Sequence, residues 1–278
     1  MAFFDGKNFR GKIGKVVYKV DKDGRMIVQS APGPVKQTEA SKKTAGVMGN
    51  ASTLSKQIRT AMFRLFDDNH PGNMINALSA ANRTILEHCC DKETMTYTFQ
   101  EDSFDNLAGF QFNDKSPISS FLWVKPYLTL NENKDKITLT IPAFEIPQQL
   151  KMANYANMCE IHVAMGQYAL HKGLEKRIPP QQAEIGVNQT EFPETAFLFD
   201  IMPGCLGVIG IGFKYYQLQN QIKTPLNSKL LNPAAIVGAI YTPGTFVKPP
   251  QEISANRGKA DPWQRMDKLN LKAANAEG

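Results

Sequence analysis

Residues 11–32 read Gly-Lys-Ile-Gly-Lys-Val-Val-Tyr-Lys-Val-Asp-Lys-Asp-Gly-Arg-Met-Ile-Val-Gln-Ser-Ala-Pro, and a long helical pattern follows them. This stretch predicts a β-hairpin with arms at 13–20 and 25–30, because β-branched and aromatic residues flank the turn sequence Asp-Lys-Asp-Gly. Val16, Tyr18 and Val20 share one face of the first arm, and Lys15 and Lys19 fall on the other. The prolines that follow the second arm end the hairpin.

Two helices are expected after the hairpin. Thr38 before Glu39 is a helix start, although Gly46 and Gly49 weaken the first part of the pattern. Beyond Ser52 apolar residues recur at helical spacing: Leu54, Ile58, Ala61, Met62 and Leu65. A polar break at 67–72 precedes a second helix at 73–88. We expect the two helices to pack as an antiparallel hairpin.

From Met95 onward the pattern changes to strand-like segments. Gly166 is either an interior residue of one strand or a bend between two. The segments with alternating, aromatic or β-branched character are 95–100, 109–113, 121–130, 136–141, 158–170, 194–202, 205–217 and 235–241. They predict an α+β protein in which an antiparallel, immunoglobulin-like β-sandwich follows the hairpin and the helices.

The predicted organisation has four parts. They are a hairpin arm at 1–36, a helical hairpin at 37–92, a β-sandwich at 93–247 and an extended tail at 248–278. The tail has no apolar period and cannot form a core of its own. Its anchors Trp263, Met266 and Leu269 are spaced for one face of a short docking helix.

Aromatic residues near the N-terminus complete the expected assembly interface. Phe3, Phe4 and Phe9 lie within a polar setting and need cover from the domain edge or another subunit. With the hairpin face and the tail, the predicted interface comprises Phe3, Phe4, Phe9, Val16, Tyr18, Trp263, Met266 and Leu269.

Positive charge is concentrated in the first quarter of the chain. Residues 1–66 hold 13 Lys and Arg against 4 Asp and Glu, a net charge of +9, whereas the remainder holds 19 against 22, a net charge of −3. Such a basic head can bind nucleic acid or the acidic surface of a neighbouring copy. The candidate anion contacts are Lys12, Lys15, Lys19 and Arg25. Tyr18 is the only aromatic residue interleaved with them, which favours a neighbouring copy or a solvated face over nucleic acid.

No pattern in the sequence indicates catalysis. His88-Cys89-Cys90 is the only His/Cys cluster, and a zinc site needs four ligands, usually in two spaced pairs. The glycine-rich segment 204–212 lacks the order of a dinucleotide-binding loop and suits a buried strand with a bulge or a close contact. We therefore expect a non-enzymatic protein with no cofactor and no metal.

The sequence restricts the cellular location of the protein only in part. The N-terminus has no basic segment followed by an apolar core, and no apolar window approaches the roughly 18–20 residues of a membrane span. We expect cytoplasmic synthesis without a secretory signal, four reduced cysteines and no membrane span. The final location stays open and includes a virion or an extracellular assembly.

The head resembles a large family of uncharacterised bacterial proteins, known only as a domain of unknown function. The resemblance rests on Gly11-Lys12-Ile13-Gly14-Lys15-Val16-Val17, then Ser30-Ala31-Pro32 and Thr38. Segments 141–144, 212–217 and 232–237 are similar to parts of longer relatives. The Pro and Gln usual at the family's helix start are missing here. The resemblance implies architecture and brings no activity.

These observations favour a structural subunit that self-assembles into a filament or large homo-oligomer through its terminal arms, with copies of itself as partners. The alternative is a nucleic-acid-associated or phage-particle structural protein that uses the basic head.

Overall fold

The computed structural model describes residues 2–21, 23–31, 33, 36–250 and 261–274. The chain divides into two compact units, Met1–Lys42 (the N-terminal unit) and Lys43–Gly278 (the C-terminal unit). This division differs from the predicted one, because the helices and the sheets that follow them belong to the same unit and share a core.

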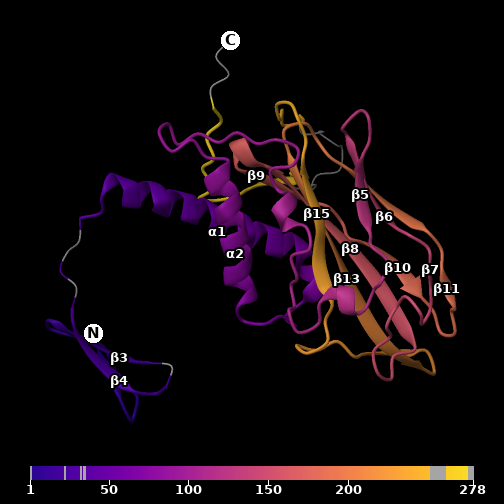
Figure 1. Cartoon of the computed structure of the whole chain (residues 1–278), viewed down its shortest axis with the longest axis horizontal. Coiled ribbons are helices and arrows are strands. Elements are labelled where there is room, and N and C mark those ends of the chain that lie inside the picture. Colours follow the sequence, from indigo (N-terminus) through magenta and orange to yellow (C-terminus); the bar gives the residue numbers. More distant parts are fainter. Residues whose placement is uncertain (1, 22, 32, 34–35, 251–260, 275–278) are drawn as a thin grey trace. The chain divides into compact units, whose positions relative to one another are not determined.

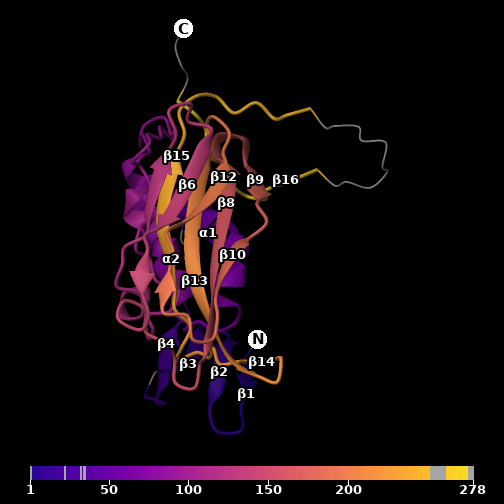
Figure 2. The same cartoon turned by 90° about the vertical axis from the view of Figure 1, so that its right-hand side faces the viewer.

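The N-terminal unit is a four-stranded antiparallel sheet in the order β1-β2-β3-β4 (Figure 2). Its strands are β1 (Phe3–Phe4), β2 (Phe9–Ile13), β3 (Val16–Val20) and β4 (Met26–Ser30). The predicted hairpin is confirmed as β3 and β4, but its first arm begins at Val16 rather than Ile13, because the chain reverses at Gly14 and Lys15. Gly14 has a φ of 57°, a conformation that glycine adopts without steric cost.

The two long helices begin and end close to the predicted residues. They are α1 (Glu39–Phe66) and α2 (Met74–His88). Thr38 caps α1, since its Oγ1 accepts a hydrogen bond from the Ser41 amide at 3.2 Å. The antiparallel packing is wrong: α2 runs across α1 rather than alongside it (Figure 1). At the contact, Ser55 Oγ donates to the Leu78 carbonyl and accepts a hydrogen bond from Asn82 Nδ2.

Among the residues that the structure describes, three short 3-10 helices lie in the connections of the C-terminal unit. They are η1 (Asp105–Leu107), η2 (Ile118–Ser120) and η3 (Leu170–Lys172).

Antiparallel strands form the rest of the C-terminal unit. The described residues include a seven-stranded sheet in the order β14-β13-β8-β9-β16, with β10 also beside β8 and β15 also beside β13. Its strands are β8 (Met158–Ala169), β9 (Leu174–Arg177), β10 (Gln181–Ile185), β13 (Leu206–Gln219), β14 (Ile222–Pro225), β15 (Ala234–Tyr241) and β16 (Trp263–Arg265). A three-stranded sheet contains β5 (Tyr127–Leu130), β6 (Lys136–Ile141) and β12 (Thr195–Asp200), and a two-stranded one contains β7 (Phe144–Glu145) and β11 (Glu191–Phe192).

The large sheet separates two apolar cores. Alternate residues of β13 point to opposite faces, so Val208 packs with the helices and Ile209 packs with the three-stranded sheet. Figure 1 shows α1 and α2 on one side of β8 and β13, with β5 and β6 on the other. The predicted α+β class is confirmed, and the two sheets have a sandwich-like arrangement.

Glycines of β13 allow α1 to approach the sheet closely. A Cβ on Gly212 would lie 2.7 Å from the Leu65 backbone oxygen, and one on Gly210 would lie 2.7 Å from Leu65 Cδ1. The pairing with β15 shifts between Ile209 and Gly210. The prediction of a buried glycine-containing strand with a bulge or a close contact is thus confirmed. Because of the shift, Ala239 on one side of it and Ile236 on the other both pack in the helix-side core.

Several predicted strands are absent from the described structure. Residues 95–100 and 109–113 form only isolated bridges, at Tyr97 and Gln111, and 121–126 form one at Leu122. By contrast, 158–169 is one uninterrupted strand, so Gly166 is not a bend between two. The short helix expected around Trp263 is also wrong, because β16 pairs there with β9. The remainder of the predicted tail at 251–260 and 275–278 lies outside the described residues.

Candidate functional site

One face of the N-terminal sheet consists almost entirely of apolar side chains. Residues paired across antiparallel strands share a face, and the register pairs Phe4 with Phe9, Tyr18 with Val28, and Val20 with Met26. The Phe4 and Phe9 rings lie 5.0 Å apart, and the Phe9 and Tyr18 rings 5.9 Å apart. This apolar face comprises Phe4, Phe9, Ile13, Val16, Tyr18, Val20, Met26 and Val28, with Gly11 and Ser30 between them.

Side chains of the apolar face are exposed or half-buried. Phe4 is 57% exposed and Val28 is 54% exposed. None of the described residues of the N-terminal unit is buried. A sheet gains stability by burying one face against another layer, so this sheet needs a covering surface.

The opposite face of the same sheet carries cations. Phe3 pairs with Arg10, and Lys12 pairs with Val17, which places these side chains away from the apolar face. Arg10 forms an ion pair with Asp5 at 2.8 Å. This cationic face comprises Phe3, Arg10, Lys12, Val17, Lys19, Ile27 and Gln29.

The predicted interface residues of the head are therefore separated into two groups. Phe4, Phe9, Val16 and Tyr18 meet on the apolar face, whereas Phe3 lies on the cationic face. Sequence reasoning missed the turn at 14–15, for which Gly14 is the signal. Without that turn, the residues of β2 and β3 that share a face cannot be identified.

The predicted anion contacts are distributed over three places. Lys12 and Lys19 share the cationic face, and Lys15 lies in the turn between β2 and β3. Arg25 closes the next turn, where its amide donates to Asp21 Oδ1 at 2.8 Å.

The predicted tail anchors lie in the C-terminal unit and contact their own chain. Trp263 is 5% exposed, and its ring lies 4.6 Å from that of Phe246. Met266 is 2% exposed, and Leu269 packs against the helix-side core. These side chains are already covered, so we leave them out of the proposed assembly surface.

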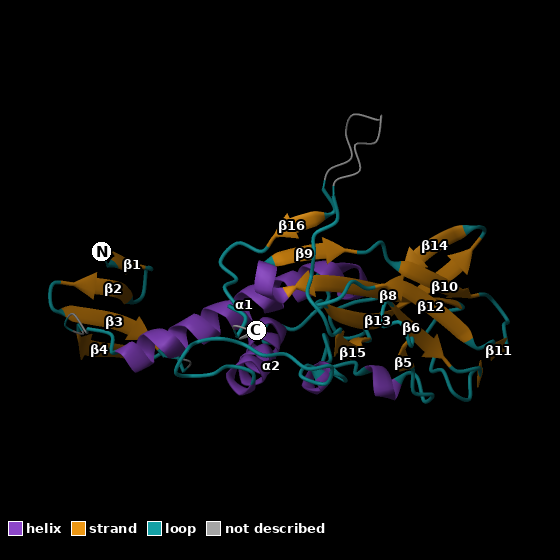
Figure 3. Ribbon diagram, turned by 90° about the horizontal axis from the view of Figure 1, so that it is seen from above, coloured by secondary structure: helices purple, strands orange, loops and turns teal. Residues whose placement is uncertain are grey.

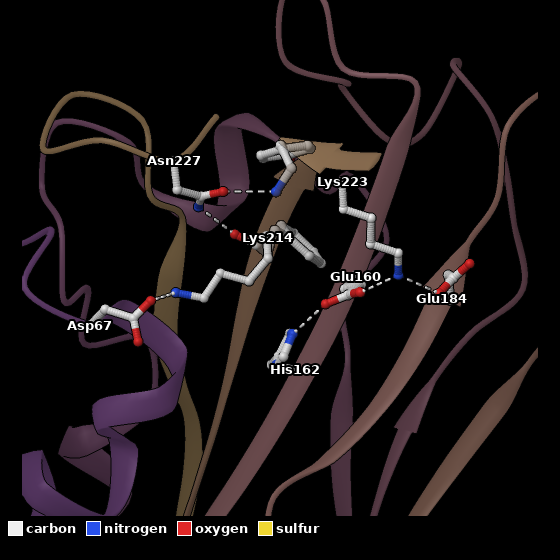
Figure 4. Close-up of polar contacts among 9 residues, drawn as sticks. Asp67, Glu160, His162, Glu184, Lys214, Lys223 and Asn227 are labelled. Carbon is white, nitrogen blue, oxygen red and sulfur yellow. Dashed lines mark hydrogen bonds and ion pairs between the residues drawn. The ribbon is translucent and has the colours of Figure 1, made fainter. Parts of the chain in front are cut away.

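Charged side chains, of which Glu160 and Lys214 are buried, gather on the helix-facing side of the large sheet (Figure 4). Glu160 accepts hydrogen bonds from His162 Nε2 at 3.0 Å and from Lys223 Nζ at 2.9 Å. Lys223 also contacts Glu184 at 3.1 Å. Lys214, nearly buried, donates to Asp67 just beyond the end of α1 at 2.5 Å.

These ion pairs connect strands of the large sheet to one another and to Asp67, the residue after α1. Burial opposes the charge of Glu160, but the hydrogen bonds from Lys223 and His162 outweigh it and lower the pKa of the carboxyl. Burial and the nearby Glu160 raise the pKa of Tyr216 to about 12, so its hydroxyl stays protonated at neutral pH. Because Lys223 contacts both Glu160 and Glu184, it connects β14 to β8 and β10.

The cysteines are free thiols in the described structure. Burial raises the pKa of Cys205 to about 12 and raises that of Cys89. A thiol whose pKa is raised is a poor nucleophile, since the thiolate is the reactive form. The described residues contain no group of three or more His, Cys, Asp or Glu side chains arranged to hold a metal ion.

Neither described long helix is apolar enough along its length to cross a membrane. No protein-family model matches the sequence, and neither a curated protein nor a solved structure matches the chain. The functional proposal therefore rests on the residues of the chain itself.

Proposed function

We propose that this chain is a structural subunit that assembles with copies of itself through the apolar face of its N-terminal sheet. The observation that carries the proposal is a β-sheet with one apolar face in a unit whose described residues include none that is buried. A lone sheet of this size is marginal in water, and burial of this face in an assembly would stabilise it.

A second copy is the partner that the residue types favour. The apolar face carries no charged side chain, and the charges of the sheet lie on its other face or in its turns. Burial of the apolar face therefore leaves no unpaired charge in the interface. If the apolar face of each copy binds a different surface of the next copy, the same contact repeats head to tail along the assembly. Such repetition gives a ring or a filament.

The test compares two neighbouring phenylalanines. Phe4→Ser, alone and together with Phe9→Ser, is expected to shift the full-length protein toward monomer, because it removes aromatic area from the apolar face. Phe3→Ser is the matched control, since Phe3 is 63% exposed on the opposite face of the same short strand. Assembly is measured by sedimentation velocity and by electron microscopy of negatively stained particles.

A wild-type chain that stays monomeric at high concentration would refute the proposal. Equal effects of Phe3→Ser and Phe4→Ser would refute the assignment of the interface to the apolar face.

We also propose two finer points of architecture. Residues 93–247 form an immunoglobulin-like sandwich, supported by two antiparallel sheets around one apolar core. The head belongs with the uncharacterised bacterial family that it resembles, supported by the quoted hairpin residues. An experimental structure of a member of that family would test both, through its strand order.

The second candidate function is nucleic-acid binding by the cationic face, in a nucleic-acid-associated or phage-particle protein. Arg10, Lys12 and Lys19 share this face with Phe3, which could stack on a base. Lys12→Glu together with Lys19→Glu should abolish a salt-dependent mobility shift of single-stranded DNA and leave self-assembly intact. A shift that persists in this double variant would exclude the cationic face.

A further inference from the structure

A cavity of about 430 Å³ lies between α1 and the C-terminal strap, which we define as residues 261–274. Lys56 and Arg59 line it from α1, and Arg265 and Lys268 line it from the strap; Figure 3 shows α1 and β16, where the strap begins. The remaining lining residues are Ser52, Thr53, Gln57 and Asp267. We call this cavity the cationic cleft.

The described residues that line the cationic cleft leave an excess of positive charge. Four cations line it together with one carboxylate, that of Asp267. Among the described residues, none of the four cations forms an ion pair. The nearby Glu175, which Lys56 attracts, is already paired with Arg177 at 3.0 Å. Like charges gathered in a concave surface raise the local potential and favour an anion.

Arg59 carries a donor that the described structure leaves without a partner. Its Nε is buried and has no hydrogen-bond acceptor. Burial lowers the pKa of Arg59, as expected for a cation partly removed from water without a carboxylate beside it. Buried donors are nearly always paired, so the Arg59 Nε is left to bond an acceptor from outside the chain, either a water or a ligand atom.

The strap is attached firmly enough to present its two cations. Asn50 Nδ2 donates to the Asn270 carbonyl at 2.9 Å, and the Asn270 amide donates to Asn50 Oδ1 at 2.9 Å. The Met266 amide donates to the Gly173 carbonyl at 2.8 Å. Between these attachments Lys268 has a φ of 75°, a left-handed conformation that is uncommon for lysine. Strain of this kind often occurs at binding sites.

A neighbouring cavity of about 380 Å³ extends the available space. Lys268 lines both this cavity and the cationic cleft. On α1 the cavity is lined by Gly46 and Gly49, and a Cβ atom added to either glycine would have no atom within 4 Å. Tyr97 and Lys272 line it as well. A ligand with its anionic group in the cationic cleft would have room here for an uncharged part.

We propose that the cationic cleft binds a small phosphorylated molecule, with its phosphate between Lys56 and Arg59 of α1 and Arg265 and Lys268 of the strap. Guanidinium groups match the geometry of phosphate oxygens in paired hydrogen bonds, and lysines add point charges. Each cavity has a volume typical of a small-molecule site. This site shares no residue with the apolar face, and the proposal does not depend on self-assembly.

The test measures binding of inorganic pyrophosphate to the full-length protein by isothermal titration calorimetry at neutral pH. Arg59→Gln and Arg265→Gln are each expected to weaken binding about tenfold or more, because each removes a bidentate donor. Arg64→Gln is the matched control: it removes the same charge from an exposed position of α1 outside the cleft and should leave binding unchanged. Circular dichroism reports whether each variant folds.

If Arg59→Gln disturbs folding, Arg265→Gln still tests the proposal, because Arg265 is exposed and its substitution does not alter the core. No saturable binding by the wild type, or equal affinities in the wild type and Arg265→Gln, would overturn the proposal. Binding of single-stranded DNA but not of pyrophosphate would overturn it too, in favour of an extended polyanion surface. Phe4→Ser should bind pyrophosphate as the wild type does, so failure of self-assembly and failure of this site can be distinguished.

Discussion

Glu160 and Glu175 both lie in the large sheet, yet their surroundings shift their pKa values in opposite directions. Hydrogen bonds from Lys223 and His162 stabilise the Glu160 carboxylate and lower its pKa despite burial. Burial dominates at Glu175, so its pKa is raised, although Arg177 and Lys56 oppose the shift. The same residue type therefore contributes differently to stability at the two positions.

Glu160→Gln is expected to lower the free energy of unfolding at neutral pH by about 1–3 kcal/mol, because it removes charged hydrogen bonds in a nearly buried site. Since the folded pKa lies below the ordinary value of 4.5, this contribution is complete above pH 4.5 and is lost as the pH falls through the folded pKa. Urea unfolding of wild type and variant at neutral and at acidic pH measures both effects. A difference that grows on acidification would contradict the assignment.

Glu175→Gln is the contrasting case and should leave stability at neutral pH unchanged or higher. A raised folded pKa means that folding disfavours the charged form, so the wild type gains stability as the pH falls through that pKa toward 4.5. Glutamine resembles the neutral acid at every pH. Urea unfolding at neutral and at acidic pH measures the stability of this variant too. If Glu175→Gln lowers the free energy of unfolding as much as Glu160→Gln does, the ion pair of Glu175 with Arg177 outweighs the cost of burying the carboxylate.

At the scale of elements, α1 continues through the two glycines that weaken its sequence pattern. Val47 and Ala51 are buried beside them and anchor this part of the helix in the core. Tertiary packing thus stabilises a segment of low helix propensity, as is common in folded proteins.

Gly49→Ala should raise the free energy of unfolding by about 0.5–1 kcal/mol, because an added Cβ meets no atom within 4 Å and alanine favours the helix. Gly212→Ala is the comparison on β13. Its Cβ would lie 2.7 Å from the Leu65 backbone oxygen, so the expected result is destabilisation by about 1–3 kcal/mol. Chemical denaturation of both variants measures the difference, and equal effects would contradict the close approach of α1 to β13.

At the scale of the whole molecule, every buried residue among those described lies in the C-terminal unit. We therefore expect a chain without residues 1–36 to unfold cooperatively, with a midpoint close to that of the full-length protein. The retained Thr38 still caps α1. Calorimetry of dilute samples tests this, and a large fall in the midpoint would show that the N-terminal sheet stabilises the rest of the chain.

Local sequence patterns were sufficient for the elements that carry a strong period. The bounds of α1, α2 and β6 follow from apolar spacing and from the break at 67–72, because these signals act within a few residues. The apolar strands β8 and β13 were likewise recognisable from their composition. Weakly periodic segments such as 95–100 were misjudged, since a strand forms only where a partner edge is available.

Sequence alone determined the α+β class, the two long helices followed by strands, and the gathering of aromatic and basic residues in the head. Tertiary structure alone decided that Phe4 shares a face with Phe9 and Tyr18, that Trp263 is buried in its own chain, and that Arg265 and Arg59 line the same cavity. The physical reason is the range of the interactions. Periodicity reflects contacts between near neighbours in the chain, whereas strand register and the path of the strap depend on contacts between residues far apart in sequence.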